Sequence, residues 1–379
     1  MLIYFVFALA LLSMTSMRAG RVLLALYALK LGAQPLTIGI LASTFSILPM
    51  VFSLQAGKLT DRFGARWLLT FGAIGSALGM LVPAAIPMLA AIFAAAALSG
   101  LSTTFYNVSL QNLVGLLSTP ESRAHYFSNF SLVLAISSFI GPFFIGFLID
   151  HYGYAVSCLG LMALSFIPAV LLLWWGAALP GGSAKRKEKP GGVRTRIAEP
   201  GVIKLLATSG LVQSGLDMFQ FYMPVYGHSL DLSAGAIGVI VAMYSAAAFV
   251  VRSVMPYLLK RFSAETVLAY AFYLGAASFL VVPFCHSIVL LCVVSFAFGI
   301  GMGVGQPITM MMTFSSSAEG RSGEALGLRL SVNHLTRVIG PVLFGWAGSA
   351  FGLPSIFWAN ALLLASGGAL TSTKPDAKP

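Results

Sequence analysis

Long apolar runs separated by short polar stretches cover almost the whole chain. Each run is about 20 residues long, and an α-helix of that length, which rises roughly 1.5 Å per residue, crosses the hydrocarbon core of a bilayer. The pattern therefore predicts about 12 membrane-spanning helices. Their expected bounds are 3–30, 36–56, 67–86, 88–111, 125–149, 154–176, 204–229, 236–258, 265–284, 288–312, 324–348 and 353–371.

The longest polar segment lies between the sixth and the seventh expected helix. Its composition, Pro and Gly among basic side chains, is typical of a solvated linker, and contact with acidic lipid is the alternative. We expect an N-terminal six-helix bundle at 1–176, a cytoplasmic basic linker at 177–203 and a C-terminal six-helix bundle at 204–379. The basic residues of the linker are Lys185, Arg186, Lys187, Lys189, Arg194 and Arg196.

The two predicted bundles are copies of one another. Short sequences of the first half recur 199 positions later without a gap, over some 115 residues. This offset predicts two halves in parallel orientation, related by an axis along the membrane normal. The recurring pairs are Ile38-Gly39 with Ile237-Gly238, Arg62-Phe63 with Arg261-Phe262, Gly141-Pro142 with Gly340-Pro341, Gly146 with Gly345, and Gly153 with Gly352.

Composition excludes a soluble protein. Apolar residues make up 58% of the 379 residues and charged residues only 9%, whereas a soluble domain has about 25% charged residues. The net charge of +11 would suggest a nucleic-acid partner in a soluble chain, but its location here argues against one. Of the 22 Lys and Arg residues, 16 fall in the linker, alternate loops and the C-terminus, and only Lys30 falls in the loops of the other face. By the positive-inside rule, we expect a multi-pass protein of the cell's inner (plasma) membrane, with both termini cytoplasmic.

A ten-residue island of glycine and charge, Gly57 to Arg66, separates the second and third apolar runs. It resembles the loop signature of the major facilitator superfamily: a glycine, three residues, Asp-Arg, one residue, a glycine and basic residues. Ala65 departs from that signature, where the family usually has a basic residue. The resemblance implies a gate that holds the cytoplasmic side shut through the eleventh helix. The expected gating residues are Gly57, Asp61, Arg62, Gly64 and Arg66.

The resemblance also implies the fold and the general activity. It predicts an all-α membrane protein of twelve helices in two six-helix bundles, related by pseudo-two-fold symmetry around a central cavity, which works as a monomer by alternating access. Gly141-Pro142, with its copy Gly340-Pro341, resembles a helix-packing motif that is typical of the family's exporters, although Ile145 replaces one closing glycine. Ala96 stands where drug–proton exchangers usually have an arginine, a departure from proton-driven drug export of the usual kind.

Ionisable side chains inside the expected helices are candidates for function, because each costs at least about 2.5 kcal/mol at the bilayer centre. Asp217 is the repeat mate of Arg18, so we expect Arg18 or Arg21 to meet Asp217 across the cavity, either in a structural pair or in one that opens during transport. Arg252 and Arg329 are expected to extend toward the interface instead. Arg18, Arg21 and Arg337 are candidates for binding an anionic group, since a guanidinium binds carboxylate or phosphate well.

Polar side chains gather on the helices that the resemblance places around the cavity. Helix-to-helix hydrogen bonding is the alternative reading for each of them. His334 could relay a proton or be a satisfied interior histidine. These further candidates for solute or coupling are Tyr106, Asn107, Gln220, Tyr226, Gln306, Asn333 and His334.

These observations favour a secondary transporter of a small organic solute, with the lipid bilayer and that solute as its partners. The chain contains no phosphate loop, nucleophile elbow or paired metal ligands, so we expect no cofactor, no metal site and no enzymatic activity. We also expect transport to be coupled to protons. Export is the preferred direction. The alternatives are uptake of an organic anion, and a sensor or scaffold built on a transporter fold.

Overall fold

The computed structural model describes residues 2–118, 123–176, 179, 200–315 and 322–372. Within these ranges the helices are joined by short turns, and there is no strand. The helices are α1 (Leu2–Lys30), α2 (Pro35–Phe63), α3 (Ala65–Ala85), α4 (Leu89–Leu116), α5 (Arg123–Trp175), α6 (Pro200–Ser229), α7 (Ala234–Arg261), α8 (Ala264–Val281), the 3₁₀ turn η3 (Val282–Phe284), α9 (Ile288–Met302), α10 (Gly305–Ser315), α11 (Ser322–Phe351) and α12 (Leu353–Ser372).

The all-α membrane fold expected from the apolar runs is confirmed. Nine described segments are long and apolar enough to cross a membrane, and the segment in α5, 44 residues long, has room for two crossings. α6 and α11 are 30 residues each, but they are more polar because they contain Asp217, Arg329 and Arg337. Together, the described helices are consistent with twelve crossings.

Three expected helices differ in detail from the structure. The fifth and sixth form one helical run, α5, which bends at Gly153, where φ is 75°. The tenth is broken into α9 and α10 at Gly303 and Val304. The expected loop from Gly57 to Arg66 is mostly helix: α2 continues to Phe63, and only Gly64, with φ of 81°, separates it from α3. A helix does not stop where its apolar run stops, and only the residue with positive φ forces the turn.

The predicted repeat is visible in the backbone itself. Gly153 and Gly352 both have positive φ, 75° and 85°, and they are 199 positions apart. Gly32, with φ of 84°, matches Asp231, with φ of 58°, at the same spacing. Asp231 is the one non-glycine residue with positive φ among those described. The copies therefore share their turns even where the residue type differs.

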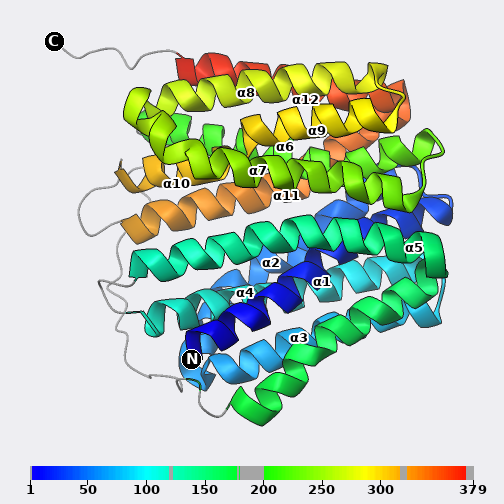
Figure 1. Cartoon of the computed structure of the whole chain (residues 1–379), viewed down its shortest axis with the longest axis vertical. Helices are drawn as coiled ribbons and strands as arrows, with labels where there is room; N and C mark the ends of the chain where they lie inside the picture. The colour runs from blue at the N-terminus through cyan, green and yellow to red at the C-terminus, as the bar shows by residue number, and fades with distance from the viewer. Residues whose placement is uncertain (1, 119–122, 177–178, 180–199, 316–321, 373–379) are drawn as a thin grey trace.

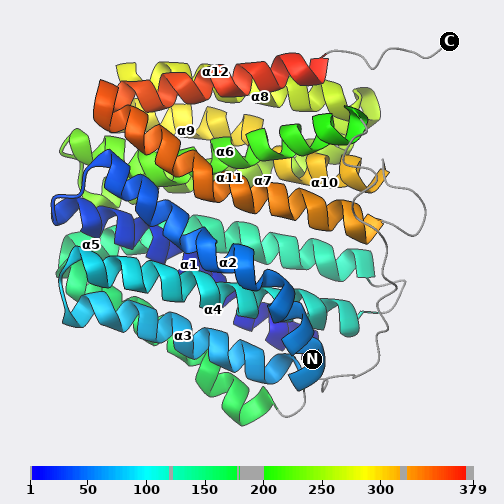
Figure 2. The same ribbon diagram turned by 180° about the vertical axis from the view of Figure 1, so that it is seen from behind.

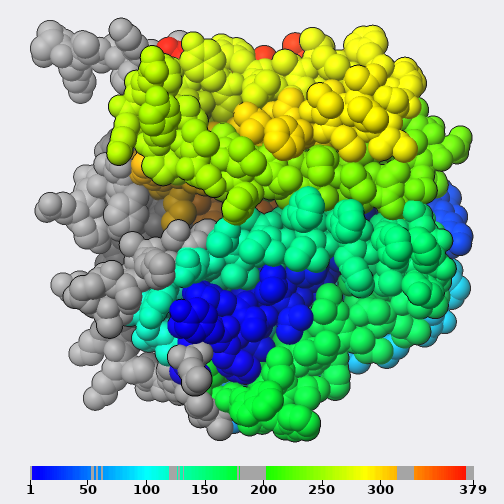
Figure 3. Space-filling view, in the orientation of Figure 1, coloured from blue at the N-terminus to red at the C-terminus, as the bar shows by residue number. Residues whose placement is uncertain are grey.

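The helices form two halves that lie side by side, α1 to α5 in one and α6 to α12 in the other (Figures 1 and 2). We call the end of the molecule where α5 ends and α6 begins the linker end, and the end with the α1–α2 and α6–α7 turns the far end. The two arms of α5 diverge from the bend at Gly153, and α1 is visible between them (Figure 3). Large apolar side chains such as Trp174 and Leu362 are more than 70% exposed, as suits a surface that faces lipid.

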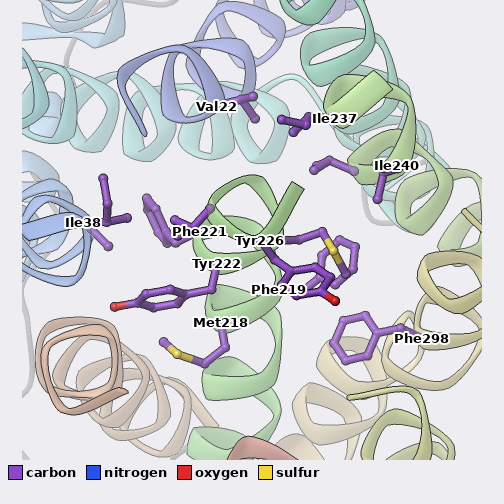
Figure 4. Close-up of a cluster of buried hydrophobic side chains, with 14 of the residues drawn as sticks. Val22, Ile38, Met218, Phe219, Phe221, Tyr222, Tyr226, Ile237, Ile240 and Phe298 are labelled. Carbon is purple, nitrogen blue, oxygen red and sulfur yellow. The ribbon is translucent and has the colours of Figure 1, made fainter. Parts of the chain in front are cut away.

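α6 lies at the centre of the largest buried apolar cluster. Phe221 and Tyr222 of α6 extend to the side of Ile38 of α2, and Phe219 extends to the side of Phe298 of α9 (Figure 4). The rings of Phe219 and Phe298 are stacked, with centroids 4.8 Å apart. Tyr222 also donates its hydroxyl to the carbonyl of Pro341 in α11 at 2.6 Å. This packing holds α6 against helices of both halves.

Toward the far end, the halves meet through two matched helix crossings. A Cβ on Gly238 of α7 would meet the carbonyl oxygen of Pro142 in α5, and one on Gly39 of α2 would meet that of Pro341 in α11. The two crossings are related by the repeat, and glycine is required at both because the backbones touch. Gly141 has a different neighbour, since its Cβ would meet α1 at Arg18, whereas a Cβ on Gly340 would make ordinary contacts with Met218 and Ser214 of α6, both at 3.9 Å.

Side chains reinforce both crossings at the far end. Asp150 of α5 accepts hydrogen bonds from the backbone N–H groups of Ala234 at 2.8 Å and Gly235 at 2.7 Å, in the first turn of α7. Its repeat mate, Ser349 of α11, accepts one from the N–H of Leu36 in the first turn of α2, at 3.0 Å. A carboxylate is favoured at a helix N-terminus by the helix dipole, so the charged contact is the stronger of the two.

Candidate functional site

Two adjacent cavities lie between the halves. The larger has a volume of about 390 Å³ and the smaller about 160 Å³. Both are lined by Arg21 of α1, Leu134 of α5, Gln306 of α10 and Arg337 of α11, so they meet at these four side chains. Such a concave space between two bundles is the usual place for a small-molecule site.

Arg21 and its repeat mate, Gln220, join the two halves. Nη1 of Arg21 donates to Oε1 of Gln220 at 3.2 Å, and the guanidinium lies 5.8 Å from the ring centroid of Phe45. Arg21 is only 8% exposed. A charge this deeply buried is normally hydrogen-bonded or paired.

Asp217 pairs with an arginine other than the two expected. Oδ2 of Asp217 lies 3.6 Å from Nε of Arg337 and accepts a hydrogen bond from Nε2 of Gln213 at 2.9 Å. The expected contact of Arg18 or Arg21 with Asp217 is therefore wrong for this conformation. Arg18 lines the smaller cavity together with Asp217 but forms no ion pair with it among the described residues. The position of a residue in the repeat predicts the depth of its side chain in the membrane. The direction in which the side chain leaves the helix determines its partner, and the repeat does not predict that direction.

Gln213 is a site residue that the sequence did not single out. It lies one turn before Asp217 on α6, and its Oε1 accepts a hydrogen bond from Nε2 of Gln306 at 2.8 Å. The available signal was the four-residue spacing from Asp217, which puts both side chains on one face of the helix. Gln213 thus connects the buried acid to the junction of the cavities.

The break between α9 and α10 lies beside the smaller cavity. Nε of Arg252 donates to the carbonyl oxygen of Gly303 at 2.9 Å, just beyond the end of α9. A cation is favoured at a helix C-terminus.

The expectation that Arg252 and Arg329 extend to the interface is wrong. Arg252 lines the smaller cavity, and Arg329 is buried, with Nη1 3.3 Å from the hydroxyl of Thr309.

Three of the sequence candidates lie away from both cavities and have partners that explain their burial. Tyr106 donates to the carbonyl oxygen of Leu9 at 3.2 Å, and Tyr226 donates to that of Cys285 at 3.2 Å. Asn333 accepts a hydrogen bond from Ser209 at 2.9 Å. The candidates that line a cavity are Arg18, Arg21, Asn107, Asp217, Gln220, Gln306, His334 and Arg337. Their role remains a prediction.

The expected gating loop is described only in part. The backbone of this segment is described, but the surroundings of Gly57 and the side chains of Asp61 and Arg62 lie outside the described part of the structure. Arg66 donates from Nε to the carbonyl of Leu172 at 3.1 Å and from Nη2 to that of Leu173 at 2.9 Å. It therefore binds the last turn of α5, within its own half.

The charge around the smaller cavity is strongly unbalanced. Its lining includes one carboxylate, Asp217, against four guanidinium groups, those of Arg18, Arg21, Arg252 and Arg337. Arginine is always charged at physiological pH and presents a planar set of donors. The described lining thus favours a ligand with negative charge.

Comparison with known sequences identifies one family. A sequence model of the Major Facilitator Superfamily matches residues 6–273 and again residues 205–379, so that the matches together span almost the whole chain. Human solute carrier family 67 member A1 is 24% identical over 347 residues, which are 86% of this chain and 81% of the relative. The class H tetracycline resistance protein of Pasteurella multocida is 20% identical over 86% of this chain and 85% of its own.

Comparison with solved structures supports the same fold. The crystal structure of the nucleoside transporter NupG superposes with a TM-score of 0.82. The alignment covers 98% of this chain and 100% of that one, at 14% sequence identity. At this identity the likeness establishes the arrangement of helices and leaves the solute open.

Proposed function

We propose that this chain, which belongs to the Major Facilitator Superfamily, is a secondary transporter that moves a small organic solute through the two central cavities by alternating access. Membership of the family makes it a multi-pass membrane transporter. The observation that supports a solute site here is the pair of adjacent cavities between the halves, lined by ionisable and polar side chains. Such side chains are costly at membrane depth and normally mark a solute path.

An anionic group on the solute fits this lining best. Four arginines and one aspartate leave excess positive charge around the smaller cavity. In this proposal, Asp217 is a temporary counter-ion: it stays near Arg337 in the empty site and gives way when an anion binds. A structural Asp217–Arg337 pair with no part in transport is the competing interpretation.

Alternating access would proceed by rocking of the two bundles, residues 1–176 against residues 204–379. The glycine–proline crossings and the Asp150 and Ser349 contacts hold the far end together in this conformation. Opening the far end requires these contacts to break while others form at the linker end. We propose that Asp61 and Arg62 serve that second closure, with both termini in the cytoplasm.

Export is the preferred direction, supported by Gly141-Pro142, which resembles a motif typical of the family's exporters. His334, which lines the larger cavity, and Asp217 are the candidates for proton coupling. Uptake of an organic anion is the alternative function. A sensor or scaffold would keep the binding site but not move the solute.

The test has two steps. A thermal-shift screen of the purified protein against organic anions, cations and neutral amphiphiles identifies a ligand, because a ligand at 100 times its dissociation constant adds about 2.7 kcal/mol of stability. Counterflow of that labelled compound in proteoliposomes then tests transport. Binding without counterflow would favour the sensor or scaffold. Thiol labelling of intact cells, with a cysteine placed at Lys30 or at Lys187, checks the orientation: reagent should reach only the former.

A further inference from the structure

Two arginines, Arg21 and Arg337, lie at the junction of the two cavities, and each has a buried Nε atom without a hydrogen-bond acceptor in the described part of the chain. Both line both cavities, from opposite halves of the molecule. A buried donor without an acceptor costs about 1–3 kcal/mol, and more when it is charged. Two such donors at one junction indicate a place where a ligand supplies the acceptors.

The geometry of Arg21 leaves one edge of its guanidinium available. Its Nη1 is committed to Gln220 across the boundary between the halves. The other edge, formed by Nε–H and Nη2–H, is the side-on pair of donors that matches the two oxygens of a carboxylate or phosphate. Gln220 and the ring of Phe45 orient the group, so little rotamer entropy would be lost on binding.

The acid of the site does not compete strongly for Arg337. Asp217 lies 3.6 Å from Nε of Arg337, outside hydrogen-bond distance, while Gln213 donates to it at 2.9 Å. Asp217 thus has an amide donor besides its ion pair with Arg337, and no hydrogen bond from Nε of Arg337 to the acid has to break when an oxyanion approaches. Gln306, which holds Gln213 in place, belongs to the first turn of α10 and faces both cavities. The N-terminus of an interrupted helix inside a transporter also favours negative charge.

The larger cavity has a different character from the junction. Apart from Arg21, Arg337 and His334, its polar lining consists of uncharged hydroxyl and amide groups. Apolar side chains such as Phe45, Met80 and Leu330 form the greater part of the wall, with the polar groups set among them. This space suits an uncharged, amphipathic body, with both apolar and hydroxyl groups, of a solute whose charged group lies at the junction. The hydroxyl and amide groups are those of Ser16, Ser46, Ser76, Ser99, Thr103, Thr104, Asn107, Gln111, Ser165 and Gln306.

We propose that Arg21 and Arg337 together bind the oxyanion group of the solute at the junction of the cavities, and that the solute is a compact organic carboxylate or phosphate ester with an uncharged hydroxyl-bearing body. The proposal rests on the proposed transport function, since it assigns the cargo to the same cavities. It adds which atoms hold the charge, which edge of Arg21 is used, and where the rest of the molecule lies.

The test is a binding assay on the purified full-length protein with four probes. Shikimate and glycerol 3-phosphate carry a carboxylate and a phosphate on hydroxyl-bearing bodies, methyl shikimate is the neutral counterpart of the first, and benzoate has an apolar body. We expect at least one of the two hydroxyl-bearing anions to bind at least tenfold more tightly than methyl shikimate. Benzoate should bind more weakly than that anion. Which of the two anions binds better separates carboxylate from phosphate.

Matched variants test the role of Arg21. Arg21→Gln should weaken the preferred anion on the order of 100-fold, as loss of a charge-assisted pair of hydrogen bonds implies, and Arg21→Lys should be only partly better. Arg261→Gln, which removes an exposed arginine far along α7 from the cavities, should bind as the parent does. If Arg21→Gln unfolds at a clearly lower temperature than the parent, Arg337→Gln provides the same test with a less buried side chain.

The outcomes separate this proposal from the transport function. The oxyanion site is overturned if neither shikimate nor glycerol 3-phosphate binds more tightly than methyl shikimate, or if affinity for the preferred anion is unchanged in both arginine variants. Counterflow of some other compound would then leave the transporter intact. Arginine-dependent anion binding without counterflow would instead support the site and contradict transport.

Discussion

In the first half of the chain, α1 brings Arg18 and Arg21 to the central cavities, whereas α6, which takes the same place in the second half, brings Asp217 and Gln220. The residues are repeat mates, 199 positions apart, so the backbone delivers four side chains at matched depth. One copy contributes two cations, and the other an acid and an amide. The repeat therefore builds the cavity, and the differences between the copies make its chemistry.

A second matched pair shows the same division at the far end. Asp150 closes one crossing with a charged group and two hydrogen bonds, while Ser349 closes its counterpart with a hydroxyl and one bond. A third pair, Gly32 and Asp231, shares a positive φ, a conformation that costs aspartate more than glycine. Substitution at one member of each pair, with its mate as the control, tests how much each difference contributes.

The largest effect is expected at the cavities. Arg18→Ala should lower affinity for an anionic solute on the order of 100-fold, because a unit charge about 5 Å away at an effective dielectric constant of about 20 contributes about 3 kcal/mol. Isothermal titration of the purified variant measures this loss. Stability should be largely kept, since Arg18 has no acidic partner among the described residues to leave unpaired. Unchanged affinity would show that α1 contributes structure alone.

A smaller effect is expected at the far end. Asp150→Ala removes two charge-assisted hydrogen bonds to α7, and we expect about a tenfold shift in population toward a conformation open at that end, equivalent to about 1.4 kcal/mol. Ser349→Ala should shift it only a few-fold. The readout is labelling of a cysteine at Leu134, which lines both cavities, after replacement of the three native cysteines. Equal acceleration in both variants would contradict a stronger charged contact.

The smallest effect is expected in the turns. Gly32→Ala should lower the free energy of unfolding by roughly 1 kcal/mol, because the left-handed conformation is costly for alanine while open space surrounds the position. Gly32→Asp should cost less, since aspartate is tolerated there in the matching turn at Asp231. Thermal unfolding of the two variants beside the parent measures the difference. If the Gly32→Ala and Gly32→Asp variants were equally stable, the loss of stability would not come from the positive φ of this position.

The sequence predicted the membrane fold and the repeat well, because both depend on patterns along the chain. Runs of apolar residues determine the spans, and a constant offset reveals the copies. What the sequence could not supply is rotation about each helix axis. It therefore missed that Asp217 faces Arg337, and that Arg252 turns inward to the broken end of α9. Depth follows from counting residues, whereas a partner depends on how helices pack.

The most direct test of the account is Asp217→Asn. If Asp217 is the temporary counter-ion of an anion site, the variant should be extracted in normal yield and bind the anionic solute as tightly as the parent or more tightly, because the arginines stay free. It should also lose counterflow, since the arginine is no longer neutralised after release. Removal of a purely structural partner would instead leave Arg337 without its acid. In that case yield and affinity would fall together, as they would not for Arg18→Ala, and the account would be wrong.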